Sequence, residues 1–146
     1  MSEQLRVTVE DEVRGGVGLS RAARVVALAV AETLFSTADG PPPVERLAWL
    51  GDELDDFFAH AGDRSRWVFL LCIHAIDRVA PLFVRRLARF SALALDERLV
   101  ALERFEASPA GLAFFGAKAA LCIVWYEHPA AARDVGYDGL CLKRSA

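Results

Sequence analysis

Few residues in this chain of 146 could hold a metal ion or move a proton, and they are widely spaced. A metal site in a helical bundle needs carboxylates and histidines that converge from facing helices, often as Glu-x-x-His pairs. His74 and Asp77 share a helical face at a spacing of three residues, but no second ligand pair answers them. For His74 we therefore expect a partly buried ring bonded to a neighbour. His60 follows Asp56 by four residues and could pair with it.

Other patterns typical of catalytic sites are also incomplete. The carboxylates between residues 52 and 56 lie on one helical face, whereas acid–base catalysis needs two carboxylates in different environments across a cleft. They indicate a solvated surface or a docking patch for a basic partner. Three glycines at 15–18 precede a helix, but the Gly-Lys-Ser/Thr ending of a phosphate-binding loop is missing. The sequence therefore predicts no catalytic residue, no metal ligand and no cofactor-binding residue in this chain.

The composition is rich in apolar residues for a chain of this length. They make up 54% of the sequence, charged residues make up 25%, and the mean hydropathy is +0.27. Such an excess predicts a face that a partner buries, although an Ala- and Leu-rich helical core would raise the same count. A net charge of −3 and scattered arginines argue against nucleic acid as a partner. The densest basic spot, Arg85, Arg86 and Arg89, indicates a solvated face or salt-bridge partners.

Capping residues and breakers define two helices in the first part of the chain. Ser20 is a typical N-cap, because its side-chain oxygen can accept an orphan amide hydrogen bond, and its helix should end near Ser36. A loop with three prolines follows, through which no helix can run. The second helix is predicted from Val44 to Ala59, with Gly62 as a left-handed terminator.

The third predicted helix has Asp63 as its N-cap and is apolar nearly all round from Trp67 to Val79. A helix without a polar face belongs in the centre of a bundle or under a partner. Pro81 should break or kink it. A fourth helix should start close to Asp96.

The fifth predicted helix runs from about Pro109 to Trp125 or Tyr126. Its inner face is predicted to consist of Leu112, Phe115, Ala119, Cys122 and Ile123. Pro129 and two later glycines indicate a non-helical tail.

These elements predict an all-α fold, an irregular bundle of five to six helices with a short non-helical N-terminal arm and C-terminal tail. The arm or linker would comprise residues 1–19, the helical domain 20–140 and the tail 141–146. No signal peptide is visible, and the uncharged stretches are about half the roughly 20 residues of a membrane span. We therefore expect a cytoplasmic protein without a membrane span, with export alongside a partner as the other possibility.

Aromatic and apolar side chains at two places are the candidates for a partner interface. Trp and Tyr are enriched at the energetic centres of interfaces, although they are also ordinary core residues. The candidates are Trp67, Phe69 and Leu70 in the apolar third helix, and Trp125, Tyr126 and Tyr137 where the last helix ends.

Two runs in the second half of the chain carry a resemblance to a known family. The first is Phe90-Ser91-x3-Leu95-Asp96-Glu97-Arg98-x3-Leu102-Glu103-x4-Ser108. The second is Phe115-x2-Lys118-x6-Trp125-Tyr126-x2-Pro129, ending in Gly136-Tyr137-x-Gly139. Together they resemble the gluconate 2-dehydrogenase subunit 3 family, over roughly residues 20–140.

The resemblance implies a small all-α subunit that is bound to a larger flavoprotein. The partner would be a dehydrogenase of the glucose–methanol–choline (GMC) type that carries FAD, acts on a sugar, alcohol or polyol and depends on the small subunit for folding or stability. Chemistry would then belong to the flavin on the partner, and further subunits could join. Many family members carry a twin-arginine export signal, and this sequence has none at its start.

Two other functions remain open from the sequence. The chain could be a standalone helical-bundle enzyme or metal-binding protein, in which His60, His74 and Asp77 would have to meet. It could also be a self-associating structural protein that uses its apolar surface on a copy of itself.

Overall fold

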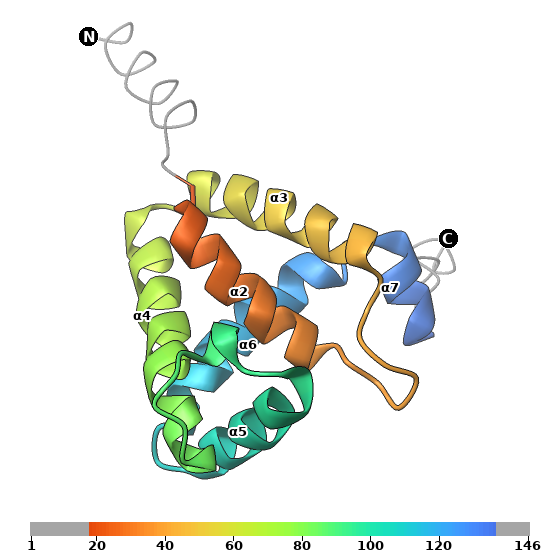
Figure 1. Ribbon diagram of the computed structural model, residues 1–146. Coiled ribbons are helices and arrows are strands. Elements are labelled where there is room, and N and C mark those ends of the chain that lie inside the picture. The colour runs from red at the N-terminus through yellow and green to blue at the C-terminus, as the bar shows by residue number, and fades with distance from the viewer. Residues whose placement is uncertain (1–17, 137–146) are drawn as a thin grey trace, which may run out of the picture.

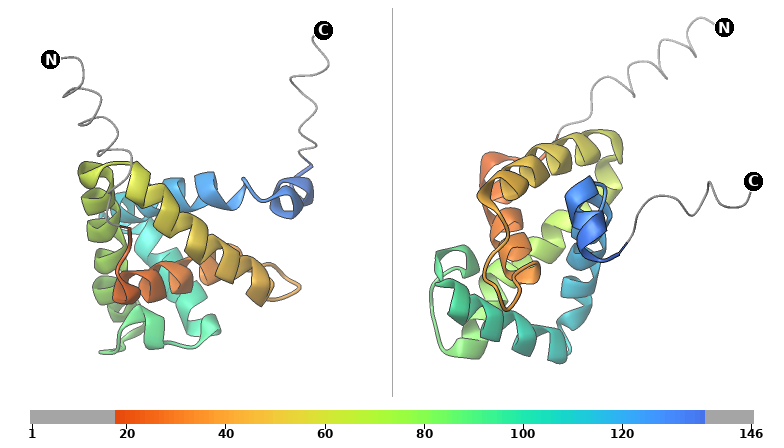
Figure 2. Two further views of the ribbon diagram at one scale, coloured as in Figure 1. Left: turned by 90° about the horizontal axis from the view of Figure 1, so that it is seen from above. Right: turned by 90° about the vertical axis from the view of Figure 1, so that its right-hand side faces the viewer.

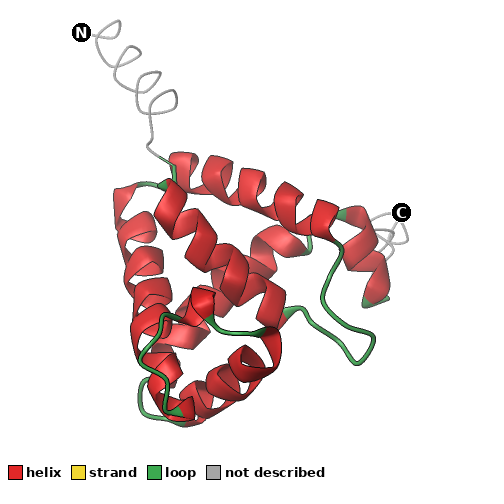
Figure 3. Cartoon of the chain, in the orientation of Figure 1, coloured by secondary structure: helices red, strands yellow, loops and turns green. Residues whose placement is uncertain are grey.

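Residues 18–136 are described by a computed structural model, and α-helices dominate this range (Figure 1, Figure 3). The six α-helices are α2 (Arg21–Leu34), α3 (Val44–His60), α4 (Asp63–Val79), α5 (Leu95–Ala107), α6 (Gly111–Trp125) and α7 (Pro129–Asp134). Two short 3₁₀ helices, η1 (Ala80–Val84) and η2 (Phe90–Ala92), connect α4 to α5. In this range the only extended pairing is a single bridge between Thr37 and Gly40, so the predicted all-α class is confirmed.

The caps and breakers act at most of the predicted positions. The Ser20 hydroxyl accepts a hydrogen bond from the Ala23 amide and caps α2. Gly62 has a φ of +85°, which only glycine adopts without strain, and it separates α3 from α4. Asp63 is the first residue of α4, so the N-cap is Gly62 and not the predicted aspartate. At Pro81 the chain changes from an α-helix to the 3₁₀ helix η1.

The helices surround α2, which contacts α3, α4, α5 and η2 (Figure 1). Helix α4 runs along one edge of the molecule and packs against α6, which lies behind α2 in this view. Helices α3 and α5 lie at opposite ends, as the turned view also shows (Figure 2). The short helix α7 returns to the start of α3, where Arg46 and Asp134 form an ion pair of 3.0 Å.

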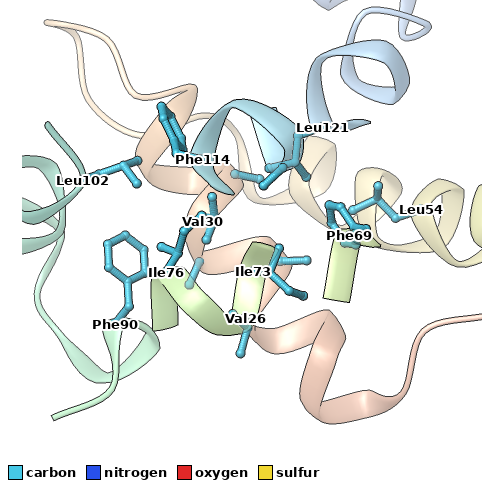
Figure 4. Packing of buried hydrophobic residues seen from close by; sticks show 14 of the residues in the cluster. Val26, Val30, Leu54, Phe69, Ile73, Ile76, Phe90, Leu102, Phe114 and Leu121 are labelled. Atoms are coloured by element: carbon cyan, nitrogen blue, oxygen red, sulfur yellow. The ribbon is translucent and has the colours of Figure 1, made fainter. Parts of the chain in front are cut away.

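The core lies where α2, α4, α5 and α6 face one another (Figure 4). Each helix contributes residues at the spacing of one helical face, which is how a single stripe becomes buried. The labelled side chains of this cluster are Val26, Val30, Leu54, Phe69, Ile73, Ile76, Phe90, Leu102, Phe114 and Leu121.

The predicted inner face of the helix now labelled α6 is wrong. The buried residues of α6 are Phe114, Ala117, Leu121, Val124 and Trp125. The predicted inward residues lie on other sides of the helix, and none of them is buried. Helix α6 is apolar on nearly every side, so the spacing of its apolar residues does not identify the face that turns to the core.

The predicted non-helical region after Pro129 is also wrong, because it forms α7. Proline lacks an amide hydrogen, but the first residue of a helix does not need one. The His128 ring caps this helix, with Nδ1 accepting a hydrogen bond from the Ala130 amide over 3.1 Å. Nearly all of the predicted arm and the tail beyond Gly136 lie outside the described residues.

A buried carboxylate connects α4 to the segment before α5. Asp77 is 1% exposed, and its Oδ1 accepts hydrogen bonds from the Ser91 amide (3.1 Å) and the Ser91 hydroxyl (3.2 Å). The two residues are 14 positions apart, so this contact fixes where the chain re-enters the core at Phe90.

We expect Asp77→Ala to lower the free energy of unfolding by about 1–3 kcal/mol, because the Ser91 amide loses its partner away from bulk water. Urea unfolding of the purified protein measures the change. Ser91→Ala is the matched control: it removes only the hydroxyl contact, so its loss should be smaller. Equal unfolding midpoints for Asp77→Ala and the wild-type protein would contradict this role.

Candidate functional site

The outward side of α4 carries a stripe of exposed or half-buried apolar residues. Val68, Leu71, Cys72, Ala75 and Val79 follow the spacing i, i+3, i+4, i+7 and i+11, which places them on one face of a helix. Leu71 is 70% exposed and Val68 53%, although both are large apolar side chains. The buried residues of α4 lie on its other side. Arg64, His74 and Arg78 are exposed beside the apolar stripe.

Helix α6 repeats this pattern. Leu112, Phe115, Gly116, Ala119 and Ile123 have the same spacing, and they face away from the buried stripe of α6. Leu112 is 79% exposed and Phe115 69%.

The two apolar faces meet where the helices pack together. A Cβ atom added to Gly116 would lie 3.0 Å from Cys72 Sγ, so the two helices approach closely at this point. Gly116 and Cys72 each belong to the outward pattern of their helix. The two faces therefore adjoin at this contact, and we name them together the α4–α6 face. Trp67 is exposed as well, but it lies beside Leu70 and the start of α2, outside this face.

The α4–α6 face is comparable in extent to the largest apolar patches on monomeric proteins. Five of its large side chains are more than half exposed, namely Val68, Leu71, Leu112, Phe115 and Ile123. At roughly 100 Å² each they expose on the order of 500 Å². The largest apolar patch on a typical monomer covers about 300–600 Å² and often marks an interaction site.

The predicted interface residues separate into exposed and buried groups. Trp67 is 61% exposed beside the start of α2, Leu70 is half-buried next to it, and Tyr126 is 39% exposed. Phe69 and Trp125 belong to the core, because they are only 3% and 4% exposed. The remaining candidate, Tyr137, lies outside the described residues.

The two buried aromatics are held by other rings. Phe69 stacks on Phe58 with 4.5 Å between ring centroids. Trp125 stacks on Phe35 at 4.2 Å, and the Arg46 guanidinium lies 5.6 Å from the indole. Such contacts stabilise the fold, so these two rings are not available to a partner in this conformation.

Sequence reasoning missed Leu112, Phe115 and Ile123 as surface residues because it placed them in the core. One signal could have found them. Gly116 in the middle of a predicted helix marks a close approach of another helix, and the residues at its helical spacing then flank that approach.

A groove of about 360 Å³ lies between the proline loop, α6 and α7, with Phe35, Trp125 and Tyr126 among its lining residues. Its charged groups are Arg46 and Asp134, which neutralise each other through their ion pair. The groove therefore offers an aromatic lining without the separated acid and base that catalysis of proton transfer requires.

The titratable residues of the sequence hypotheses do not converge. His74 is exposed, contrary to the expected partly buried ring, and Asp77 turns to Ser91. His60 does pair with Asp56, with Nδ1 3.5 Å from the carboxylate and 2.8 Å from the Asp56 carbonyl oxygen. Within residues 18–136, no three side chains of His, Cys, Asp or Glu come together as ligands for a metal ion.

Within residues 18–136, one helical stretch, Asp63–Val84, is long and apolar enough to cross a membrane, with a mean hydropathy of 1.7 and a third of its best window buried. Helices α5 and α6 meet the same criteria only as a pair, and they are bent by 116°. Core helices of globular proteins also meet them, and α4 packs against α2 and α6 here.

Comparison of the chain with protein-family models, with curated proteins and with solved structures finds no match. The resemblance to the gluconate 2-dehydrogenase subunit 3 family therefore stays a prediction from the two sequence runs.

Two half-buried cysteines lie on α4 and α6, Cys72 in the α4–α6 face and Cys122 beside it. Burial raises the pKa of the Cys72 thiol. Burial also raises the pKa of the Cys122 thiol, an effect that the nearby Lys118 ammonium partly offsets. Since the thiolate is the reactive form, a raised pKa leaves less of it at neutral pH.

We expect both thiols to react with iodoacetamide at pH 7.4 more slowly than in the urea-unfolded chain, and to speed up as the pH rises. Mass spectrometry of a Cys141→Ser variant measures the two sites without interference from the third cysteine. A folded-state rate equal to the unfolded-state rate at either site would contradict the burial of that thiol.

Proposed function

We propose that this chain is a non-catalytic small subunit that binds and stabilises a larger protein through the α4–α6 face. The carrying observation is that face, because two packed helices each expose large apolar side chains in addition to the core they share. Exposed apolar surface of this extent favours association, since its removal from water lowers the free energy.

The proposed partner is a FAD-dependent dehydrogenase of the GMC type that oxidises a sugar, alcohol or polyol. Its support is the resemblance carried by residues 90–108 and 115–139. In this arrangement the flavin stays on the partner and performs the hydride chemistry, while the small subunit contributes surface and stability. We place the complex in the cytoplasm, with export alongside the partner as the other possibility.

Several residues of the two runs stabilise the fold. Phe90 and Leu102 are buried, and Ser91 donates hydrogen bonds to the buried carboxylate of Asp77. Arg98 binds the Ala29 carbonyl and forms an ion pair of 3.0 Å with Glu32, joining α5 to α2. Phe115, by contrast, starts the second run on the exposed α4–α6 face. The runs thus combine residues that hold the fold with one that a partner could contact.

Self-association is the second candidate, and the same observation favours it. Two copies could cover each other's α4–α6 faces, and about 800 Å² per partner is typical of a stable interface. Light scattering of the isolated chain separates the cases, because a defined dimer indicates self-association, whereas a monomer or irregular aggregates indicate a face meant for another protein.

Leu71→Asp and Phe115→Asp should abolish co-purification with the flavoprotein encoded next to this chain, because each places a charge in the middle of the proposed interface. Both side chains are mostly exposed, so the fold should persist, which circular dichroism checks. Val44→Asp is the matched control, since Val44 is 77% exposed at the start of α3, outside the α4–α6 face.

The proposal predicts co-purification of the wild-type chain and the Val44→Asp variant, together with loss of soluble flavoprotein in both face variants. A flavoprotein that never associates with the wild-type chain, and that folds and turns over equally well alone, would falsify the proposed function.

A further inference from the structure

The loop between η1 and η2 displays one leucine almost completely. Residues 85–89, here named the basic loop, read Arg-Arg-Leu-Ala-Arg, and Leu87 is 98% exposed. No other large apolar residue in the described range is as exposed. A leucine at the tip of a loop gains nothing for the fold, whereas its burial by a partner removes its whole side chain from water.

The basic loop is held in place from both sides. Before it, Arg104 Nη1 donates a hydrogen bond to the Phe83 carbonyl over 2.8 Å. After it, Phe90 is fully buried and Asp77 holds Ser91. Within it, Arg86 reaches Glu97 with Nε at 2.9 Å and Nη2 at 3.3 Å. A loop with fixed ends presents its tip in one position, which lowers the entropy lost when a partner binds.

Arg85 adopts a backbone conformation that suits glycine better. Its φ of +57° and ψ of +38° are left-handed, and it is the one non-glycine residue with positive φ within residues 18–136. L-residues other than glycine pay a steric cost there, because Cβ crowds the backbone. Such strain persists at functional positions when the side chain is needed. An arginine at this point therefore indicates a use for its guanidinium.

Two of the three arginines in the basic loop are available for a partner. Arg86 is engaged by Glu97, but Arg85 and Arg89 have no carboxylate within 4 Å among the described residues. Both are exposed on either side of Leu87. The tip thus combines an exposed leucine side chain with two free guanidinium groups, each able to bind a carboxylate through two parallel hydrogen bonds.

We propose that the basic loop is a second anchor for the partner protein, and that it fits an apolar socket of leucine size with carboxylates at its rim. This inference rests on the proposed function, because the partner is the same flavoprotein that would cover the α4–α6 face. The loop follows directly from α4 through η1 and passes beside the lower end of α4 (Figure 1), so a single large partner can contact both.

A protein socket suits this tip better than a lipid surface. One leucine on a fixed loop inserts far less hydrocarbon than even a single acyl chain, which by itself gives only marginal membrane binding. Guanidinium groups held in fixed positions can each form two hydrogen bonds with a carboxylate that is also held in place. A folded protein offers such fixed carboxylates, whereas the head groups of a fluid lipid surface move.

The test measures the affinity of loop variants for the purified flavoprotein by calorimetry. Leu87→Ala should weaken binding about 30-fold, because most of the apolar side chain that the partner would bury is removed. Arg89→Gln and Arg85→Gly should each weaken it several-fold and reduce its salt dependence. Arg85→Gly should also keep or raise the melting temperature, because glycine relieves the strain at that position. Val44→Ala and Arg133→Gln are matched controls on exposed residues outside the basic loop and should bind like the wild-type chain.

The outcomes separate the two proposals. If the wild-type chain does not bind the flavoprotein, the proposed function fails and takes this inference with it. If the wild-type chain binds and the three loop variants bind equally well, the basic-loop inference alone is overturned. A melting temperature lowered by Arg85→Gly would assign the arginine to the fold and overturn its role as an anchor. Unchanged flavoprotein affinity, together with Leu87-dependent binding to phosphatidylserine vesicles, would replace the protein socket with a lipid surface.

Discussion

The close approach of α4 and α6 at Cys72 and Gly116 is the constraint on which the rest of the molecule depends. Without a side chain at 116, the two helices can pack tightly, and Ile73 and Leu121 become members of one core. The same approach leaves the other side of each helix outside that core. Among residues 18–136 no further helix covers this side, so the α4–α6 face follows from the packing of the described helices.

The size of that face also limits what it can do by itself. At about 25 cal/mol per Å², burial of roughly 500 Å² is worth on the order of 12 kcal/mol. Association costs about 4–15 kcal/mol in lost freedom, and ordered side chains add to this cost, so the surplus is modest. Apolar contact is also poorly selective, because any apolar surface of matching shape satisfies it. A second, charged contact such as the basic loop supplies the orientation and the discrimination that the face lacks.

Capping residues and breakers predicted most helix boundaries, because they act on adjacent residues. The candidate site depends instead on how distant helices pack together, which such local signals do not give. Ser20, the proline loop and Gly62 act on their own neighbours, so the boundaries of α2 and α3 could be predicted closely. The orientation of α6 could not, because Lys118 is its one charged residue and an apolar helix has no periodic signal. Trp67 and Phe69 are two positions apart along α4, yet Trp67 is exposed and Phe69 is buried. Only the placement of the neighbouring helices decides which of the two is exposed.

The buried and half-buried polar groups act at the junctions between elements. Asp77 fixes the segment before α5, Arg98 joins α5 to α2, and Arg46 joins α3 to α7. Each contact links positions far apart in the sequence or bridges two helices, so its loss would loosen the position of a whole segment rather than of one side chain. A binding surface that is already in place costs less to immobilise when a partner arrives. Of these contacts, the bond between Asp77 of α4 and Ser91 acts directly on a proposed surface, because it fixes the chain just after the basic loop, whereas the other two hold the surrounding helices together.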